Sequence, residues 1–122
     1  MLKDAEPYLL VAVGGFTGAS ARYVLNSLVP SMPGILIINV SGCILLGFLL
    51  YESIYAGAFS PQTRAIFGAG FLGAFTTFST FSLQTLQASP AIAILNMLAN
   101  LSLGLIGVMI GRQIALFTAR KL

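Results

Sequence analysis

Residues 68–82 read GAGFLGAFTTFSTFS, a run of glycines, phenylalanines and hydroxyl side chains that contains no charge. The run is too apolar for an exposed loop, yet its glycines and hydroxyls make it a poor continuous helix in lipid. Backbone polar groups at membrane depth need partners within the segment, in neighbouring protein or in a water-lined cavity. We therefore expect a membrane-spanning helix that is broken in this run, and broken transmembrane helices typically bind or conduct a solute.

The rest of the chain has a membrane-type composition. Of its 122 residues, 57% are hydrophobic and 7% are charged, whereas soluble domains carry about 25% charged residues. The formal net charge of +3 comes from scattered cations, not from a basic stripe, which argues against nucleic-acid binding. The chain has no histidine and one cysteine, Cys43, so neither a Cys/His metal site nor a disulfide framework is available.

Four apolar segments are long enough to cross a bilayer, whose hydrocarbon core of about 30 Å takes about 20 helical residues. They cover residues 8–29, 34–55, 61–87 and 90–117, and stretches rich in proline and glycine separate them. The sequence thus predicts an all-α integral membrane protein in which residues 1–122 form a single unit of four transmembrane helices. The third helix is expected to be broken near its middle.

The basic residues predict an orientation in the membrane. Four crossings place both ends of the chain on one side, where Lys3, Arg64, Arg112, Arg120 and Lys121 would lie. Only Arg22 lies towards the other side. By the positive-inside rule, we expect both termini to be cytoplasmic.

Glycines recur at short spacings on all four segments, as in Gly14-x-x-x-Gly18 and Gly104-x-x-Gly107-x-x-x-Gly111. Small residues let helix backbones approach closely in lipid. Packing within the chain explains some of these faces. Their number favours an oligomer, most simply a dimer.

Three asparagines lie inside apolar runs, where an amide must face protein or water. Asn39 lies in the second segment, and Asn96 and Asn100 share one face of the fourth. Taken singly, each could equally be an interhelical hydrogen bond or part of a polar path. Together, and without a charged partner, they suit the partial dehydration of a small ion.

Aromatic and basic side chains give two further candidates. Phe75, Phe78 and Phe81 recur every three residues beside a Thr/Ser face. Such a stripe is usually core packing, but phenylalanine ring edges carry partial positive charge and can meet an anion. Arg22 is the only cation well inside an apolar segment, which suggests the vestibule of an anion path. Snorkelling to the headgroups is the alternative.

The chain resembles the Fluc/CrcB fluoride ion channels over essentially its whole length. The TTFSTF string in a four-helix chain of this size is highly specific. The matching motifs are Gly14-Gly15-x-x-Gly18-Ala19-x-x-Arg22-Tyr23, Asn39-x-x-Gly42 and Gly70-x-x-Gly73-x-x-Thr76-Thr77-Phe78-Ser79-Thr80-Phe81.

The resemblance implies two antiparallel subunits that form one channel with two fluoride pathways. It also implies a structural Na⁺ at the dimer centre, held by the backbone carbonyls of Gly73 and Thr76. The residues expected along the fluoride path are Asn39, Phe78, Phe81, Ser79, Thr80 and Asn100, with Arg22 at the vestibule.

The sequence departs from the family pattern at several positions. Ala74 follows Gly73 where the family often has a second glycine, and Gln84 replaces a common acidic residue. Many relatives carry Tyr and Ser where Asn96 and Asn100 align. The one-sided basic residues also fit a heterodimer of two oppositely inserted paralogous chains, as an alternative to a homodimer.

The expected function is passive export of F⁻ down its electrochemical gradient across the plasma (inner) membrane of a prokaryote, giving fluoride resistance. No general base, nucleophile or nucleotide loop indicates an enzyme. The alternative is a small proton-coupled four-helix exporter of the multidrug type. Such an exporter needs a carboxylate in the membrane, and the only candidate, Glu52, lies near a segment end.

Overall fold

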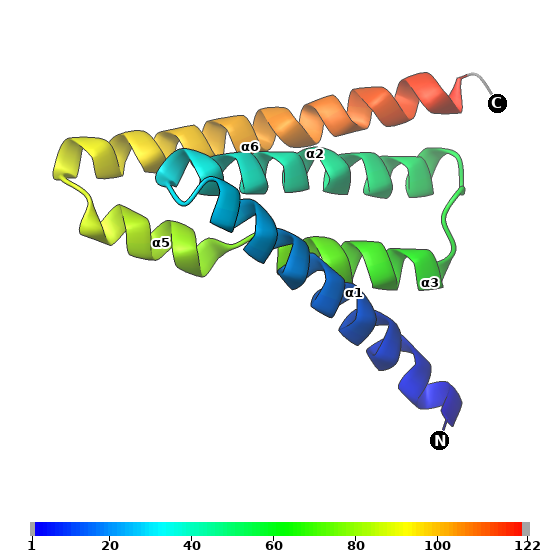
Figure 1. The fold of residues 1–122 in the computed structure, drawn as a ribbon. Coiled ribbons are helices and arrows are strands. Elements are labelled where there is room, and N and C mark those ends of the chain that lie inside the picture. Colours follow the sequence, from blue (N-terminus) through cyan, green and yellow to red (C-terminus); the bar gives the residue numbers. More distant parts are fainter. Residues whose placement is uncertain (1, 121–122) are drawn as a thin grey trace.

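The computed structural model describes the backbone of residues 2–120 and the side chains of residues 5–120. The side chain of Lys3 and the whole of Lys121, which entered the predicted orientation, lie outside these ranges. The secondary structure of the described residues is all helical, with short links between the helices (Figure 1). The elements in order are α1 (Leu2–Leu28), α2 (Met32–Tyr55), α3 (Pro61–Thr63), the π-helix η1 (Arg64–Leu72), α4 (Gly73–Phe75), α5 (Phe78–Gln87) and α6 (Pro90–Ala119).

Four helical spans are long and apolar enough to cross a membrane, namely Ala5–Leu28, Met32–Tyr55, Pro61–Gln87 and Pro90–Ala119. The all-α class with four crossings is thereby confirmed. The third span is the one that is interrupted, as the run at 68–82 predicts. Its first part, α3, η1 and α4, is continuous, and α5 completes it after a short extended link.

The helix boundaries follow local capping rules. Ser31 lies in an extended conformation before α2, and its hydroxyl accepts a hydrogen bond from the Gly34 amide at 3.4 Å. Ser60 caps α3 in the same way through the Thr63 amide at 3.1 Å. A serine or threonine oxygen at this position satisfies one of the free amides of the first turn.

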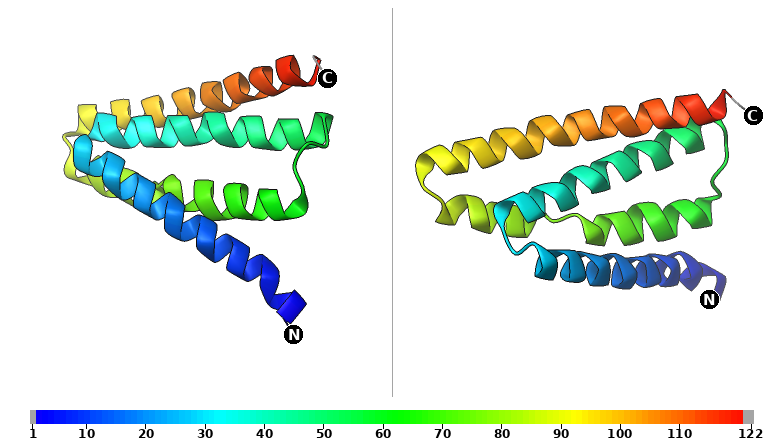
Figure 2. Two further views of the ribbon diagram at one scale, coloured as in Figure 1. Left: turned by 45° about the vertical axis from the view of Figure 1, so that its right-hand side comes forward. Right: turned by 45° about the horizontal axis from the view of Figure 1, so that its top comes forward.

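The helices pack as two pairs (Figures 1 and 2). α1 crosses η1 and α4 obliquely, and α2 runs along α6. Glycines set the separation in both pairs. A Cβ added at Gly14 or Gly18 would collide with the backbone of η1, and one added at Gly70 would collide with the backbone of α1.

The pair of α2 and α6 uses the same device. A Cβ on Gly111 would meet the backbone of α2, and one on Gly47 would meet the backbone at Val108. Packing within the chain therefore accounts for much of the glycine pattern. Gly15, which has nothing within 4 Å of an added Cβ, is not explained in this way.

The buried apolar core is small and lies beside the broken helix. Ile35, Ile38 and Phe75 form it, and Phe71 and Phe81 pack against it. Most other large apolar side chains are exposed in the single chain. Such surface is what lipid or another subunit covers in a membrane protein.

Both ends of the described chain lie at the same end of the bundle (Figures 1 and 2). Two of the arginines counted for the orientation also lie there, against the last turns of α2. Arg64 Nη1 donates to Ser53 Oγ at 3.1 Å, and the Arg112 guanidinium lies over the Tyr51 ring, 5.4 Å from its centroid.

The two neighbouring glycines of α1 provide a matched test of this packing. Gly14→Ala should lower the free energy of unfolding by about 2 kcal/mol, because its methyl group forces α1 away from η1. Gly15→Ala should leave it unchanged or slightly higher. Thermal unfolding in detergent, followed by circular dichroism, measures both. Equal melting temperatures for the two variants would contradict the close contact between α1 and η1.

Candidate functional site

The third crossing is broken by two threonines in extended conformations. Thr76 has ψ 157°, and Thr77 has φ −144° and ψ 121°. Their hydroxyls form hydrogen bonds with the backbone on the two sides of the break. Thr76 Oγ1 donates to the Leu72 carbonyl at 3.0 Å, and Thr77 Oγ1 accepts from the Thr80 amide at 3.2 Å. Thr77, one of the hydroxyl residues that made the run a poor helix, thus caps the start of α5.

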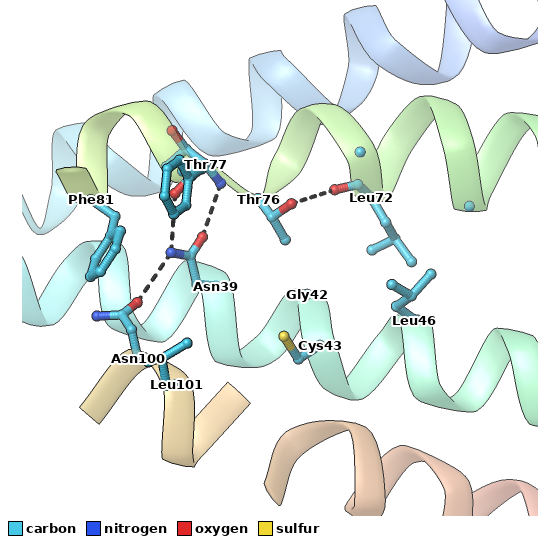
Figure 3. A pocket seen from close by; sticks show the side chains of 13 residues that line it. Asn39, Gly42, Cys43, Leu46, Leu72, Thr76, Thr77, Phe81, Asn100 and Leu101 are labelled. Atoms are coloured by element: carbon cyan, nitrogen blue, oxygen red, sulfur yellow. Dashed lines mark hydrogen bonds between the residues drawn. The ribbon is translucent and has the colours of Figure 1, made fainter. Parts of the chain in front are cut away.

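Asn39 of α2 holds the break open (Figure 3). Its Oδ1 accepts from the Thr77 amide at 2.9 Å, and its Nδ2 donates to the Thr77 carbonyl at 3.2 Å. Thr77 is 5% exposed, so its backbone groups need such partners. One side-chain amide satisfies both groups, and this pairing fixes which way the Asn39 amide points.

The pairing of the Asn39 amide with the Thr77 backbone, called the clamp below, changes the backbone hydrogen bonds around it. In an unbroken helix the Thr77 amide would donate to the carbonyl of Gly73, but here it donates to Asn39 Oδ1. The last carbonyls of α4 and the first amides of α5 therefore meet at one place. Free carbonyls carry partial negative charge and free amides carry partial positive charge. A single break can thus offer carbonyl oxygens to a cation and amide N–H groups to an anion.

Arg22 of α1 reaches this break. Its Nη1 donates to the Thr76 carbonyl at 3.1 Å. A guanidinium at the carboxyl end of a helix is electrostatically favourable. Arg22 is thus turned towards protein, which is not the snorkelling arrangement that the sequence left open.

A cavity of about 350 Å³ lies against the break, between α2, α6 and the third crossing (Figure 3). In the described part of the chain, no charged side chain lines it. Its lining residues are Asn39, Gly42, Cys43, Leu46, Gly68, Leu72, Gly73, Thr76, Thr77, Phe78, Phe81, Asn100 and Leu101. Two of the predicted amides, both predicted phenylalanines and both predicted carbonyl residues are therefore brought together.

The phenylalanine stripe is divided by the break. Phe75, on α4, is buried and stacks on Phe71 with ring centroids 5.6 Å apart. Phe78 and Phe81, on α5, line the cavity with centroids 5.7 Å apart and ring planes at 50°. Phe78 is 79% exposed. The core interpretation thus holds for Phe75, whereas Phe78 borders open space and Phe81 both packs against the core and lines the cavity.

The remaining predicted residues lie elsewhere. Arg22 and Thr80 line a second cavity of about 270 Å³ between α1, α2 and α5, together with Tyr23 and Asn26. Ser79 is exposed and lines neither cavity, and its Oγ lies 3.3 Å from Thr77 Oγ1. Sequence reasoning missed Asn26, which lies one turn beyond Arg22 on the same helix face.

Asn100 and Asn96 continue the polar contacts away from the break. Asn39 Nδ2 donates to Asn100 Oδ1 at 3.2 Å (Figure 3), and Asn100 Nδ2 donates to Asn96 Oδ1 at 3.1 Å. Asn96 Nδ2 donates in turn to Thr85 Oγ1 at 2.8 Å. Sequence reasoning missed Thr85, although its position four residues after Phe81 places it on the same face of α5.

The chain has four potential membrane crossings, and one of them is broken beside a cavity lined by amide and aromatic side chains. This arrangement is typical of a membrane channel or transporter. Residues 9–112 match the protein-family model described as "CrcB-like protein, Camphor Resistance (CrcB)". The chain belongs to this family, and it is a multi-pass membrane protein.

Curated relatives agree with this assignment. The chain is 53% identical over 107 residues to "Fluoride-specific ion channel FluC 1" of Methanospirillum hungatei, which covers 88% of this chain and 76% of the relative. It is 42% identical to FluC 2 of Methanosarcina acetivorans, over 92% of this chain and 89% of the relative. A third relative, FluC 1 of Haloarcula marismortui, is 37% identical over 93% of this chain and 88% of its own length.

The clamp can be tested by removing the amide. Asn39→Leu should lower the free energy of unfolding by about 2–4 kcal/mol, because it leaves the buried Thr77 amide and carbonyl without partners. Ser41→Ala is the matched control on α2, since Ser41 donates only to the Ile38 carbonyl one turn back. Chemical denaturation in detergent measures both variants. A loss no larger than that of Ser41→Ala would show that Asn39 does not support the break.

Proposed function

We propose that this chain is a subunit of a fluoride-specific ion channel that exports F⁻ passively. The observation that carries the proposal is the cavity at the break, lined by Asn39, Phe78 and Phe81, in a chain with 53% identity to a FluC channel. Conduction makes and breaks no covalent bond, so the protein is not an enzyme.

The cavity lining suits a small anion that must lose water and still leave. Amide N–H groups replace water molecules around an anion without a fixed charge that would trap it. The edges of the Phe78 and Phe81 rings add weak positive potential. The first amides of α5 point their partial positive charge towards the same region.

Arg22 supports an entry vestibule on the α1 side. It lines the second cavity with Tyr23, Asn26 and Thr80. A guanidinium beside polar donors raises the local concentration of anions by electrostatic attraction. Arg22 Nη1 already donates to the Thr76 carbonyl, which balances part of the charge of the guanidinium. Arg22 is therefore suited to attract an anion without binding it tightly.

We further propose that the carbonyls of Gly73 and Thr76 hold a structural Na⁺ at the dimer centre. Backbone carbonyl oxygens suit a hard cation, and the Gly73 carbonyl has lost the Thr77 amide as its helical partner. The Thr76 carbonyl accepts from Arg22 and keeps a second lone pair. Bound Na⁺ would supply fixed positive charge beside the anion path.

The proposed assembly is an antiparallel dimer in the plasma (inner) membrane of a prokaryote. The main cavity is open on one side of the single chain, and exposed apolar surface lies beside it. Both features support a second subunit that covers this side. Methanosarcina barkeri has both a FluC 2 and a FluC 3 relative. Paralogues of this kind keep the heterodimer as an alternative to the homodimer.

The proton-coupled exporter is the weaker candidate. Glu52 is 4% exposed, and its Oε2 has no hydrogen-bond partner among the described residues. It lies thirteen residues after Asn39 on α2, which is about 20 Å along a helix. Glu52 lines neither of the cavities at the break, so no contact joins its carboxyl group to the site.

Anion efflux from liposomes tests the proposed function. Liposomes that contain the purified protein should release F⁻ rapidly, whether or not a proton gradient is present, and should release little Cl⁻. Phe78→Ile should slow F⁻ efflux at least about tenfold, as expected for the loss of one aromatic interaction of ordinary strength. Leu83→Ile, at an exposed position of α5, is the control.

Each outcome separates the candidates. Equal efflux of F⁻ and Cl⁻, or none, would refute a fluoride channel, and dependence on a proton gradient would favour the exporter. Activity that appears only when a paralogous chain is added would select the heterodimer.

A further inference from the structure

A single chain of hydrogen bonds leads from the break through α2 and α6 to α5, and all its donors point the same way. The bonds join the Thr77 amide to Asn39 Oδ1 (2.9 Å), Asn39 Nδ2 to Asn100 Oδ1 (3.2 Å), Asn100 Nδ2 to Asn96 Oδ1 (3.1 Å), Asn96 Nδ2 to Thr85 Oγ1 (2.8 Å) and Thr85 Oγ1 to the Phe81 carbonyl (2.7 Å).

Backbone groups fix the direction of this chain at both of its ends. At one end, the Thr77 amide can only donate and the Thr77 carbonyl can only accept, so the Asn39 amide cannot be reversed. At the other end, Thr85 donates its only hydroxyl proton to the Phe81 carbonyl. Its oxygen is therefore an acceptor towards Asn96. The two ends demand the same direction.

This direction determines which atom Asn100 turns towards Asn39. Asn100 Nδ2 is held by two oxygens of Asn96, the backbone carbonyl at 3.0 Å and Oδ1 at 3.1 Å. Its Oδ1 is left to face the second N–H of Asn39. In this arrangement Asn100 presents a hydrogen-bond acceptor, and not a donor, to Asn39.

The bond between Asn39 and Asn100 is the part of the chain that an anion can reach. Both residues line the main cavity, whereas Asn96 and Thr85 do not. Asn96 is 8% exposed. An anion in the cavity that is to be bound by Asn39 must therefore take the N–H that Asn100 Oδ1 now holds.

We propose that Asn100 Oδ1 is a built-in competitor that determines which anions Asn39 can bind. The inference rests on the proposed fluoride channel. Fluoride displaces the carbonyl oxygen because a hydrogen bond to an ionised acceptor is roughly twice as strong as one between neutral groups, and fluoride is a small and strong acceptor. Chloride is larger and a weaker acceptor, and it fails to displace the oxygen.

Asn96 and Thr85 act as positioning residues in this scheme. They do not touch the anion, but they keep the Asn100 oxygen aimed at Asn39. Aligned hydrogen bonds also polarise one another, which strengthens each bond in the chain. Residues outside the cavity thereby strengthen the bond between Asn39 and Asn100 that an anion must displace.

Paired efflux measurements of F⁻ and Cl⁻ test the proposal. In Asn100→Ala, the ratio of Cl⁻ efflux to F⁻ efflux should rise about tenfold, the factor for one hydrogen bond of ordinary net strength. Thr85→Val should also raise this ratio, because the Asn100 amide is no longer held in its orientation towards Asn39. Thr85→Ser keeps the hydroxyl and should restore selectivity. Ser102→Ala, exposed on α6, is the control.

The results separate this proposal from the one on which it rests. A wild-type protein that moves no F⁻ refutes the channel itself. A conducting wild type with an unchanged ratio of Cl⁻ efflux to F⁻ efflux in Asn100→Ala and Thr85→Val refutes the competitor alone. If Asn100→Ala does not fold, Thr85→Val against Thr85→Ser decides.

Discussion

The pairing of the Asn39 amide with the backbone of Thr77 is the interaction on which the site depends. It replaces the helical hydrogen bond that Thr77 would make with Gly73 and so allows two residues to remain extended at membrane depth. Without such a partner, each of these backbone groups would cost several kcal/mol in lipid. The open carbonyls, the start of α5 and the position of the cavity all follow from this pairing.

Close helix packing makes the pairing possible. Glycines at Gly14, Gly18 and Gly70 let α1 and η1 touch through their backbones, which brings Arg22 within hydrogen-bond reach of Thr76. Glycines between α2 and α6 similarly bring Asn100 against Asn39. The small residues thus act on the site by setting the distances between helices, although none of them has chemistry of its own.

The polar groups around the break fall into two sets with different electrostatics. On one side, uncharged amides and two phenylalanine rings border a cavity between α2, α5 and α6. On the other side, a guanidinium, a phenol and the amide of Asn26 border a cavity beside α1. A path that attracts an anion with charge and then dehydrates it with neutral donors needs both sets, and the broken helix separates them.

The sequence alone determined the class of the protein and the kind of site. Apolar segments of bilayer length predicted four helices, and the conflict between apolarity and glycine or hydroxyl content in residues 68–82 predicted the break, because both depend on local composition. The motif around Phe78 and Phe81 was equally local. Tertiary structure decided what each polar group contacts: that Asn39 clamps Thr77, that Arg22 turns to Thr76, that Thr80 lies apart from the main cavity and that Thr85 ends the amide chain. A hydrogen bond between residues far apart in the sequence depends on helix rotation and separation, and only the packed backbones fix those.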